Sequence, residues 1–485
     1  MLKGDIVMTD RIQILADMAL EKIPAAAADY QDISDRLLAA DDETRLKILS
    51  DELPALHVID RYTLIAGSYP FFRAFRPGAF ADLNRVFQNY TQHVNKLLIH
   101  AGNHKTADFS YVIRHGMRSY LERIHAAMET HQADEEKLHF LRELEFACRM
   151  VLGWTRSFAT ACLHHARSES DPVRKSELLE MARICQKVPY EPAETFHEAI
   201  QSYFFVFSFF PDGVGRLDQY LYPCYQRDLE TGRITRAAAL ELIENLFLRI
   251  FSCAGIQHEW SGINHGVAGG YTQDGASGHN ECTSLVLEAV CELPTWRPQI
   301  SYRVTRKTTA AQMAEVVEAN VRRPDLVLFL NDDVLLPNLE NIGIPFRDAV
   351  EYSVSGCNEL LITGRSHMSS LDGIMNIMHS LDRLWEREDL SSVFDFDSFY
   401  RLWEASLAQD IAVITRLSYE RDKECANDPD LTTSLFTDGC IESALPVTCG
   451  GAKYNYCTWC LTGLVNLADS MNVIRQMVFA EKRFL

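Results

Sequence analysis

Three short runs of strand-forming residues, separated by helical patterns, constrain the fold of this chain more than any other feature. Residues 299–304, 325–330 and 350–355 read QISYRV, DLVLFL and VEYSVS. Helical patterns over residues 310–321 and 335–341 lie between them. Strands that alternate with helices at this spacing form a sheet or barrel that the helices cover, which is an α/β fold. The second run is almost entirely apolar, which predicts a strand buried on both faces.

Helices precede these strands over most of the chain. Hydrophobic residues recur with helical spacing in five segments: residues 10–23, 109–128, 135–166, 196–210 and 236–251. The fourth segment is rich in aromatic residues, so we expect it to be a buried helix. Thr235 is a suitable N-cap for the fifth segment, and Glu241 and Glu244 fall on its expected outer face.

Charge and hydropathy exclude several classes of protein. The chain has 67 acidic and 47 basic residues, a formal net charge of -20. This argues against binding to nucleic acids or to anionic membranes, both of which need basic surfaces. The longest apolar run, residues 199–210, is too short to cross a bilayer, and the first ten residues lack the features of a signal peptide. The expected location is therefore the cytoplasm, where most of the 13 cysteines would be reduced.

A family resemblance rests on stretches of sequence that follow one another in order. They are residues 104–112 (HKTADFSYV), 215–223 (GRLDQYLYP), 269–288 (GGYTQDGASGHNECTSLVLE), 329–339 (FLNDDVLLPNL), 354–359 (VSGCNE) and 434–455 (SLFTDGCIESALPVTCGGAKYN). Together they resemble the glycyl radical enzymes of the pyruvate formate-lyase type, over most of the chain. The resemblance implies a ten-stranded barrel surrounded by helices, incomplete in this chain. It also implies one pyruvate formate-lyase-like domain over residues 1–485 that lacks the glycyl radical domain.

Cys357, in the stretch VSGCNE, matches the position at which such enzymes form a thiyl radical. The resemblance implies that this radical takes a hydrogen atom from the substrate and later returns one. The transfer is reversible because S–H and C–H bonds have similar strengths. Since such a radical must be kept from water, we expect Cys357 on a loop deep inside the barrel. The strand-like run 350–355, followed by Gly356, provides such an exit from strand to loop.

Glu359 follows two positions later, in the pattern Gly-Cys-x-Glu. This pattern resembles the dehydratase, lyase and decarboxylase branches of the family, in which the glutamate acts as a base on a substrate hydroxyl. Asn358 stands where the pyruvate formate-lyase branch has a second cysteine, which argues against the alternative of formate C-acetyltransferase-like acyl transfer. The implied reaction is cleavage of a carbon–heteroatom or carbon–carbon bond in a small polar substrate.

Three further residues match substrate-binding positions less closely. His104 and Asp108 are four residues apart, as in diol dehydratases, but Ala107 stands where the family usually has proline. A structural role for His104 is therefore the alternative. Asp372 is one position out of register with the aspartate that follows the cysteine loop in that branch.

Four cysteines gather late in the sequence: Cys440, Cys449, Cys457 and Cys460. The spacing of the last two, CTWC, suits tetrahedral zinc or redox chemistry. The alternative is an ordinary loop and helix start, because the surrounding residues match the family there. We expect no bound metal.

The family's RVxGY-like motif, which carries the glycyl radical, does not occur in this sequence. The first interpretation is a split enzyme, in which a second subunit supplies the radical after activation by a radical-SAM enzyme under anaerobic conditions. No cofactor would then bind to this chain directly, and the chain could form a homodimer. The other interpretations are a truncated product and a non-catalytic homologue that acts as a binding or regulatory protein. Outside the family, a helical scaffold protein remains the alternative, and it predicts no special environment for Cys357.

Overall fold

The computed structural model describes residues 8–21, 36, 40–57, 59, 61–66, 93–94, 97–98, 104–209, 213–255, 264–356, 358–367, 373–426, 430–456 and 458–483. The chain forms two compact units. Unit 1 comprises Met1–Pro77, His104–His367 and Asp430–Asn455, and unit 2 comprises Gly78–Asn103, Met368–Pro429 and Tyr456–Leu485.

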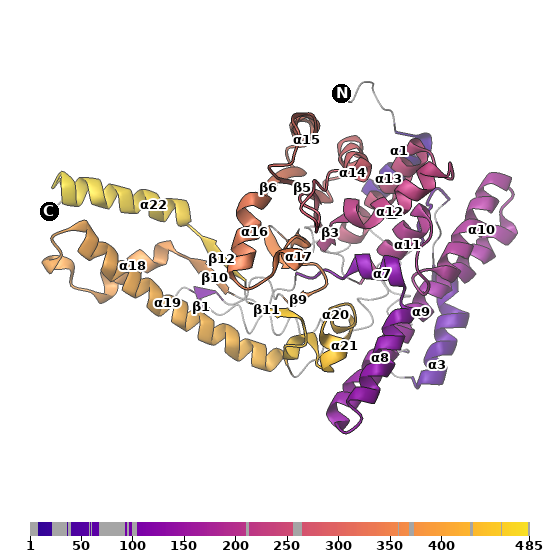
Figure 1. The fold of residues 1–485 in the computed structure, drawn as a ribbon, viewed down its shortest axis with the longest axis horizontal. Coiled ribbons are helices and arrows are strands. Elements are labelled where there is room, and N and C mark those ends of the chain that lie inside the picture. Colours follow the sequence, from indigo (N-terminus) through magenta and orange to yellow (C-terminus); the bar gives the residue numbers. More distant parts are fainter. Residues whose placement is uncertain are drawn as a thin grey trace. The chain divides into compact units, whose positions relative to one another are not determined.

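Helices make up most of unit 1 (Figure 1). They are α1 (Asp10–Glu21), α3 (Asp42–Lys47), α4 (Leu53–Leu56), α7 (Phe109–His115), α8 (Arg118–Thr130), α9 (Glu135–Ser168), α10 (Pro172–Lys187), α11 (Phe196–Phe207), α12 (Leu217–Glu230), α13 (Arg236–Gly255), α14 (Glu281–Glu292), α15 (Ala310–Arg322), α16 (Asp332–Asn341), α17 (Phe346–Ala349), α20 (Leu431–Leu435) and α21 (Cys440–Ser443). Four of the five helices predicted ahead of the strands are confirmed as single helices. The segment predicted over residues 109–128 instead forms α7 and α8. They separate at Gly116, whose φ of 69° is left-handed and whose Cβ, if present, would overlap the carbonyl of Tyr190.

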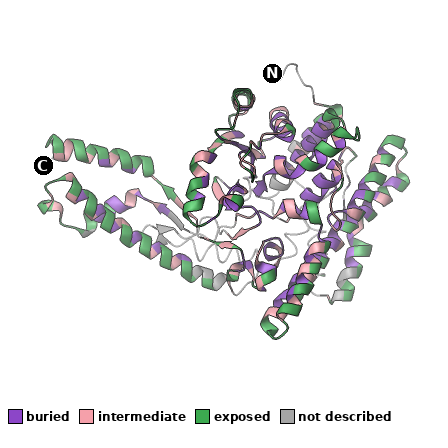
Figure 2. Ribbon diagram, in the orientation of Figure 1, coloured by how far each residue is buried: buried purple, intermediate pink, exposed green. Residues whose placement is uncertain are grey.

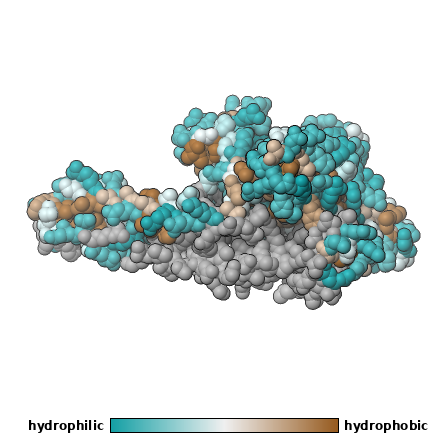
Figure 3. Space-filling model, turned by 90° about the horizontal axis from the view of Figure 1, so that it is seen from below, coloured by the Kyte–Doolittle hydropathy of each residue, from teal (hydrophilic) through white to brown (hydrophobic). Residues whose placement is uncertain are grey.

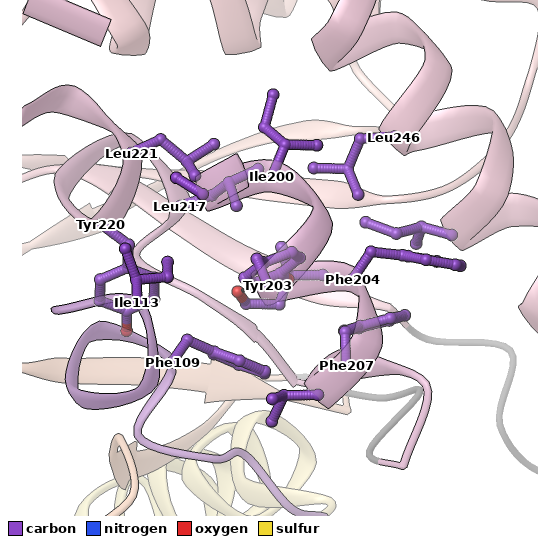
Figure 4. Packing of buried hydrophobic residues seen from close by; sticks show 14 of the residues in the cluster. Phe109, Ile113, Ile200, Tyr203, Phe204, Phe207, Leu217, Tyr220, Leu221 and Leu246 are labelled. Carbon is purple, nitrogen blue, oxygen red and sulfur yellow. Dashed lines mark hydrogen bonds between the residues drawn. The ribbon is translucent and has the colours of Figure 1, made fainter. Parts of the chain in front are cut away.

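The core of unit 1 forms around α11, as its aromatic sequence predicts. Thr195 begins this helix with a capping box, in which its side chain accepts from the N–H of Glu198. Every α11 side chain from Glu198 to Phe207 is buried. Figure 4 shows Ile200, Tyr203, Phe204 and Phe207 packed among side chains of α7, α12 and α13. Each large apolar side chain buried in this way contributes about 1.5–3 kcal/mol, so α11 is a rigid centre for the sheet that follows.

A four-stranded parallel sheet follows in the order β3-β4-β5-β6. Its strands are β3 (Gly213–Gly215), β4 (His265–Gly269), β5 (Gln299–Val304) and β6 (Val327–Asn331). Helices α14 and α15 make the crossovers from β4 to β5 and from β5 to β6, as in α/β proteins. Strand β7 (Tyr352–Ser355) lies against β3 and β4. The alternation of strands and helices predicted from the sequence is confirmed.

Two expectations about burial are wrong. Strand β6 is not buried on both faces: Val327 is buried, but Phe329 is exposed and its neighbours are half-buried. Among the described residues β6 is the edge strand of its sheet, so fewer neighbours cover it. Glu244 does not lie on an outer face of α13 but is 3% exposed, because both α1 and α14 pack against this helix. The predicted cap is confirmed, since Thr235 Oγ1 accepts from the N–H of Ala238 at 3.2 Å.

Unit 2 has a small sheet and a core of its own. Its elements are β1 (His93–Val94), β2 (Leu97–Leu98), β10 (Gly373–Asn376), β12 (Trp459–Thr462), α18 (Met378–Arg387), α19 (Phe396–Cys425), α22 (Leu464–Val473) and the π-helix η4 (Ile474–Ala480). The four strands pair in the order β1-β2-β10-β12. Leu384, Trp403 and Leu467 form part of a core that joins α18, α19 and α22.

The surface of unit 2 is partly apolar. Around α18 and α22, Figure 3 shows hydrophobic side chains at the surface, and Figure 2 shows α22 largely exposed. Trp385, Phe394 and Val465 are among the exposed side chains. In the part of the chain that the structure describes, no helix is both long enough and apolar enough to cross a membrane.

Candidate active site

The segment that contains Cys357 connects two antiparallel strands. Strand β7 pairs with β8 (Glu359–Ile362), and Ser355 lies opposite Glu359. The connection is three residues long, from Gly356 to Asn358, and its central residue, Cys357, lies outside the described residues. All four residues of β7 are buried. The predicted exit from a buried strand into a short loop is confirmed.

His104 lies against the residue that precedes Cys357. Gly356 has a left-handed φ of 57°, and a Cβ at this position would overlap the imidazole of His104. Only glycine combines this backbone conformation with so close an approach. The structure therefore brings one predicted site residue, His104, to the connection that holds another, Cys357.

A second histidine reaches the same connection and was not singled out in the sequence. His265, the first residue of β4, is fully buried. Its Nδ1 lies 3.3 Å from the carbonyl oxygen of Gly356, and its Nε2 lies 2.8 Å from Ser301 Oγ on β5. A carbonyl oxygen only accepts hydrogen bonds, so Nδ1 of His265 donates to the oxygen of Gly356. In a neutral imidazole Nε2 then has no proton and accepts from the Ser301 hydroxyl. The only sequence signal was its place just before the stretch GGYTQDG.

Glu359 begins β8 and is half-buried. Its Oε2 accepts a hydrogen bond from the backbone N–H of Asn358 at 3.0 Å. The carboxylate thus turns back toward the Gly356–Asn358 connection. A base that acts on a substrate beside Cys357 would need this orientation.

Two buried arginines hold the start of β7. Arg303 on β5 donates from Nη1 to the carbonyl oxygens of Val350 and Tyr352, at 3.0 and 3.1 Å. Arg216, which precedes α12, donates from Nη1 to the same Val350 oxygen at 2.7 Å and from Nη2 to the carbonyl of Tyr271 at 2.9 Å. Both residues are at most 1% exposed. They therefore fix the strand that leads to Cys357 from two directions.

Asp332 neutralises Arg303. Its two carboxylate oxygens accept from Arg303 Nε and Nη2, each at 2.9 Å. They also accept from the Tyr352 hydroxyl at 2.6 Å and from the N–H of Tyr271 at 3.0 Å. Although burial alone would raise it, the pKa of Asp332 is lowered by Arg303 and these hydrogen bonds. Arg216 and Asp332 come from the stretches GRLDQYLYP and FLNDDVLLPNL, whose sequences resembled the family without revealing this role.

Asp108 has a local structural role. It is the N-cap of α7, and its Oδ1 accepts from the N–H of Tyr111 at 2.9 Å. Its side chain packs on Gly364, where a Cβ would overlap it. Burial raises the pKa of Asp108. A role in substrate binding stays a prediction for both Asp108 and Asp372, and Asp372 lies outside the described residues.

The late cysteines show no gathering of ligands in the described part of the chain. Cys440 is buried, Cys449 is exposed and Cys460 is half-buried on β12, while Cys457 lies outside the described residues. Burial raises the pKa of Cys440 well above its ordinary value, which disfavours the thiolate that zinc needs. Among the described residues, no three histidine, cysteine or acidic side chains are placed to hold a metal ion.

Comparisons with known proteins identify the family of the chain. A family model described as "Pyruvate formate lyase-like" matches residues 84–485. The chain is 28% identical to isethionate sulfite-lyase of Nitratidesulfovibrio vulgaris, over 78% of this chain and 50% of that protein. It is also 28% identical to trans-4-hydroxy-L-proline dehydratase of Clostridioides difficile, over 71% of this chain and 48% of that protein. The chain thus spans about half the length of these curated relatives.

Solved structures show the same fold. One, described as a study of 1,2-propanediol dehydration in Roseburia inulinivorans, superposes with a TM-score of 0.84 at 23% identity. The match covers 99% of this chain and 72% of that one. The expected fold class, an incomplete α/β barrel of the glycyl radical enzyme type, is confirmed.

Proposed function

The chain belongs to the pyruvate formate lyase-like family of glycyl radical enzymes, and we propose that it is the substrate-binding subunit of a radical lyase. Cys357 is its hydrogen-abstracting residue and Glu359 its base. The observation that carries this proposal is the β7–β8 hairpin, whose connection contains Cys357 and is followed at once by Glu359. His104 and His265 contact that connection from different segments, and Arg216 and Arg303 anchor the strand that precedes it.

The proposed reaction begins on this chain at the sulfur of Cys357. The thiyl forms an S–H bond with a hydrogen atom from a substrate carbon, and the unpaired electron passes to that carbon. Glu359 takes the proton of the hydroxyl on the same carbon, while the leaving group departs from the adjacent carbon with its electron pair. The product radical then takes the hydrogen atom back from Cys357, and Glu359 passes its proton to the leaving group.

The source of the radical is a second part of the proposal. Glycyl radical enzymes are generally activated by a radical-SAM enzyme. We propose that the glycyl radical supplies the unpaired electron in trans, from a second subunit. No cofactor then binds to this chain directly.

The relatives support a substrate class. Isethionate, trans-4-hydroxyproline and 1,2-propanediol, after which similar proteins are named or described, are all small molecules with a hydroxyl group. A hydroxyl gives Glu359 a proton to remove, and an imidazole such as that of His104 could bind the same oxygen. We therefore propose a small hydroxylated substrate for this chain.

The test is anaerobic reconstitution. The chain would be purified together with the polypeptide encoded by the neighbouring reading frame and treated with a radical-SAM activating enzyme. We expect a glycyl radical signal by electron paramagnetic resonance and turnover of isethionate or 1,2-propanediol, in which a leaving group stands on the carbon next to a hydroxyl-bearing one. Cys357→Ala should abolish turnover and keep the signal, whereas Glu359→Gln should lower kcat by about 100-fold or more.

The matched control is Cys449→Ser, which alters an exposed thiol and should leave turnover unchanged. Turnover that survives Cys357→Ala would show that another residue abstracts the hydrogen. A neighbouring frame that does not encode an RVxGY-like motif would contradict the second subunit.

A further inference from the structure

Unit 1 contains a cavity of about 320 Å³ whose described lining includes neither His104, His265 nor Glu359. Its walls come from the start of α7, from α8, from the turn after β8 and from residues 436–442. This volume lies at the lower end of the range for small-molecule sites and has room for roughly ten water molecules.

Two polar groups in the cavity lining lack hydrogen-bond partners among the described residues. Tyr120 is 2% exposed, yet its hydroxyl has no hydrogen-bond partner among the described residues. Asp108 uses Oδ1 to cap α7, while in the described part of the chain its Oδ2 has no hydrogen-bond partner and no cation within ion-pair distance. Asp108 is half-buried, and a ligand that enters the cavity can bind both groups in place of water.

The cations in the lining are already engaged. Arg123 donates from Nε and Nη2 to the two carboxylate oxygens of Glu442, at 2.8 and 3.0 Å. Arg365 donates from Nη1 to Asp348, which is outside the cavity, at 2.7 Å. Arg123 Nη2 also lies 3.6 Å from Asp438, whose side chain is 43% exposed, so this one arginine serves two carboxylates and Asp108 adds a third carboxylate to the lining. The cavity is electrostatically suited to a cation.

We propose that this cavity binds a small organic ammonium ion through Asp108 and Tyr120. An ammonium group has three donors and no acceptor, and both Asp108 Oδ2 and the Tyr120 oxygen can accept from it. The buried ring of Phe436, also in the lining, provides an apolar surface for the carbon atoms of the ligand. An anion would instead face the carboxylates of Asp108 and Asp438. The described lining includes no residue of the β7–β8 hairpin, and binding there does not depend on radical chemistry.

Three probes of similar size test the charge preference: ethanolamine, ethylene glycol and glycolate, which are cationic, neutral and anionic. Binding to the intact chain would be measured by saturation-transfer NMR and by calorimetry. We expect ethanolamine to bind about tenfold or more tightly than either of the other two, because one charge-assisted contact is lost with each. Equal binding of the three, preference for glycolate, or no binding of ethanolamine would overturn the proposal.

Two variants locate the site. Asp108→Asn keeps an N-cap residue for α7 but removes the charge, and should weaken ethanolamine about tenfold. Tyr120→Phe removes one hydroxyl and should weaken it by about threefold to tenfold. Asp134→Asn is the matched control, because Asp134 caps α9 in the same way and is not in the cavity lining. Unchanged affinity in both cavity variants, or an equal loss in Asp134→Asn, would place the ligand elsewhere.

Discussion

Among single residues, Glu244 is in an unfavourable environment for its charge. It is 3% exposed within α13. Burial, followed by the nearby carboxylates of Glu292, Glu241 and Glu288, raises the pKa of Glu244 to about 8. In the unfolded chain this pKa returns to its usual value near 4.5. Folding therefore favours the protonated form, and ionisation of Glu244 opposes folding.

This difference predicts that stability falls as pH rises. The folded protein holds the Glu244 proton more tightly, so its contribution is fully present below about pH 4.5 and is lost as pH rises through about 8. Glu244→Gln removes the titration, and at pH 8.5 it should raise the free energy of unfolding by about 1–4 kcal/mol. The measurement is urea unfolding between pH 5 and pH 8.5. Glu122→Gln, at a side chain that is 70% exposed, should change little at any pH. A constant difference between wild type and Glu244→Gln at every pH would contradict the assigned titration.

The residues of the candidate site differ in how much of their role the sequence reveals. Cys357 and Glu359 stand in one short pattern, so a single stretch was enough to single them out. His265, Arg216 and Arg303 come from three separate segments and act on main-chain atoms near positions 350–356. Their role depends on how β4, β5 and β7 pack together in space, and a short stretch of sequence does not show this packing.

At the level of secondary-structure elements, the β7–β8 hairpin depends on a single backbone conformation. Gly356 combines a left-handed φ with contact to the His104 ring. The sequence predicted a strand that ends at a glycine, and this is confirmed. It could not predict the ring behind the glycine, because His104 is about 250 residues away in the chain. The break between α7 and α8 has the same origin, since Gly116 packs on the distant Tyr190.

The hairpin yields a prediction about Gly356→Ala. The substitution should cost about 1–2 kcal/mol for the left-handed backbone and about 1–3 kcal/mol more for the overlap with His104. His104→Ala should remove the cost of the overlap. The double variant should therefore be more stable than the sum of the two single changes would predict. The measurement is a double-mutant cycle of unfolding free energies in urea.

Gly232 provides the control for this cycle. Its φ of 68° is also left-handed, but a Cβ there would meet nothing within 4 Å. Gly232→Ala should therefore show only the backbone cost and no coupling to His104→Ala. Additive effects of Gly356→Ala and His104→Ala would mean that the ring does not press on the hairpin in solution.

At the scale of the whole molecule, the chain divides into two units with separate cores. The core of unit 1 surrounds α11 and includes Leu246 of α13, whereas that of unit 2 joins α18, α19 and α22 around Leu384. The family match at residues 84–485 runs through both units. The sequence indicated the family over this whole length, but the division itself depends on which distant segments pack together. Unit 2, for example, is built from three separate stretches of chain.

Because the two units have separate cores, we expect a destabilising substitution in the core of one unit to leave the stability of the other unit unchanged. Leu384→Ala and Leu246→Ala each remove a fully buried leucine, and each should cost about 2–5 kcal/mol in its own unit. Hydrogen exchange measured by mass spectrometry would locate the effect. We expect Leu384→Ala to speed exchange in α18, α19 and α22 while α11 and α13 keep their protection, and Leu246→Ala to do the reverse. If Leu384→Ala speeds exchange in α11 and α13 as much as in α18, the two units unfold as one, because only shared cooperativity would carry the loss from one core into the other.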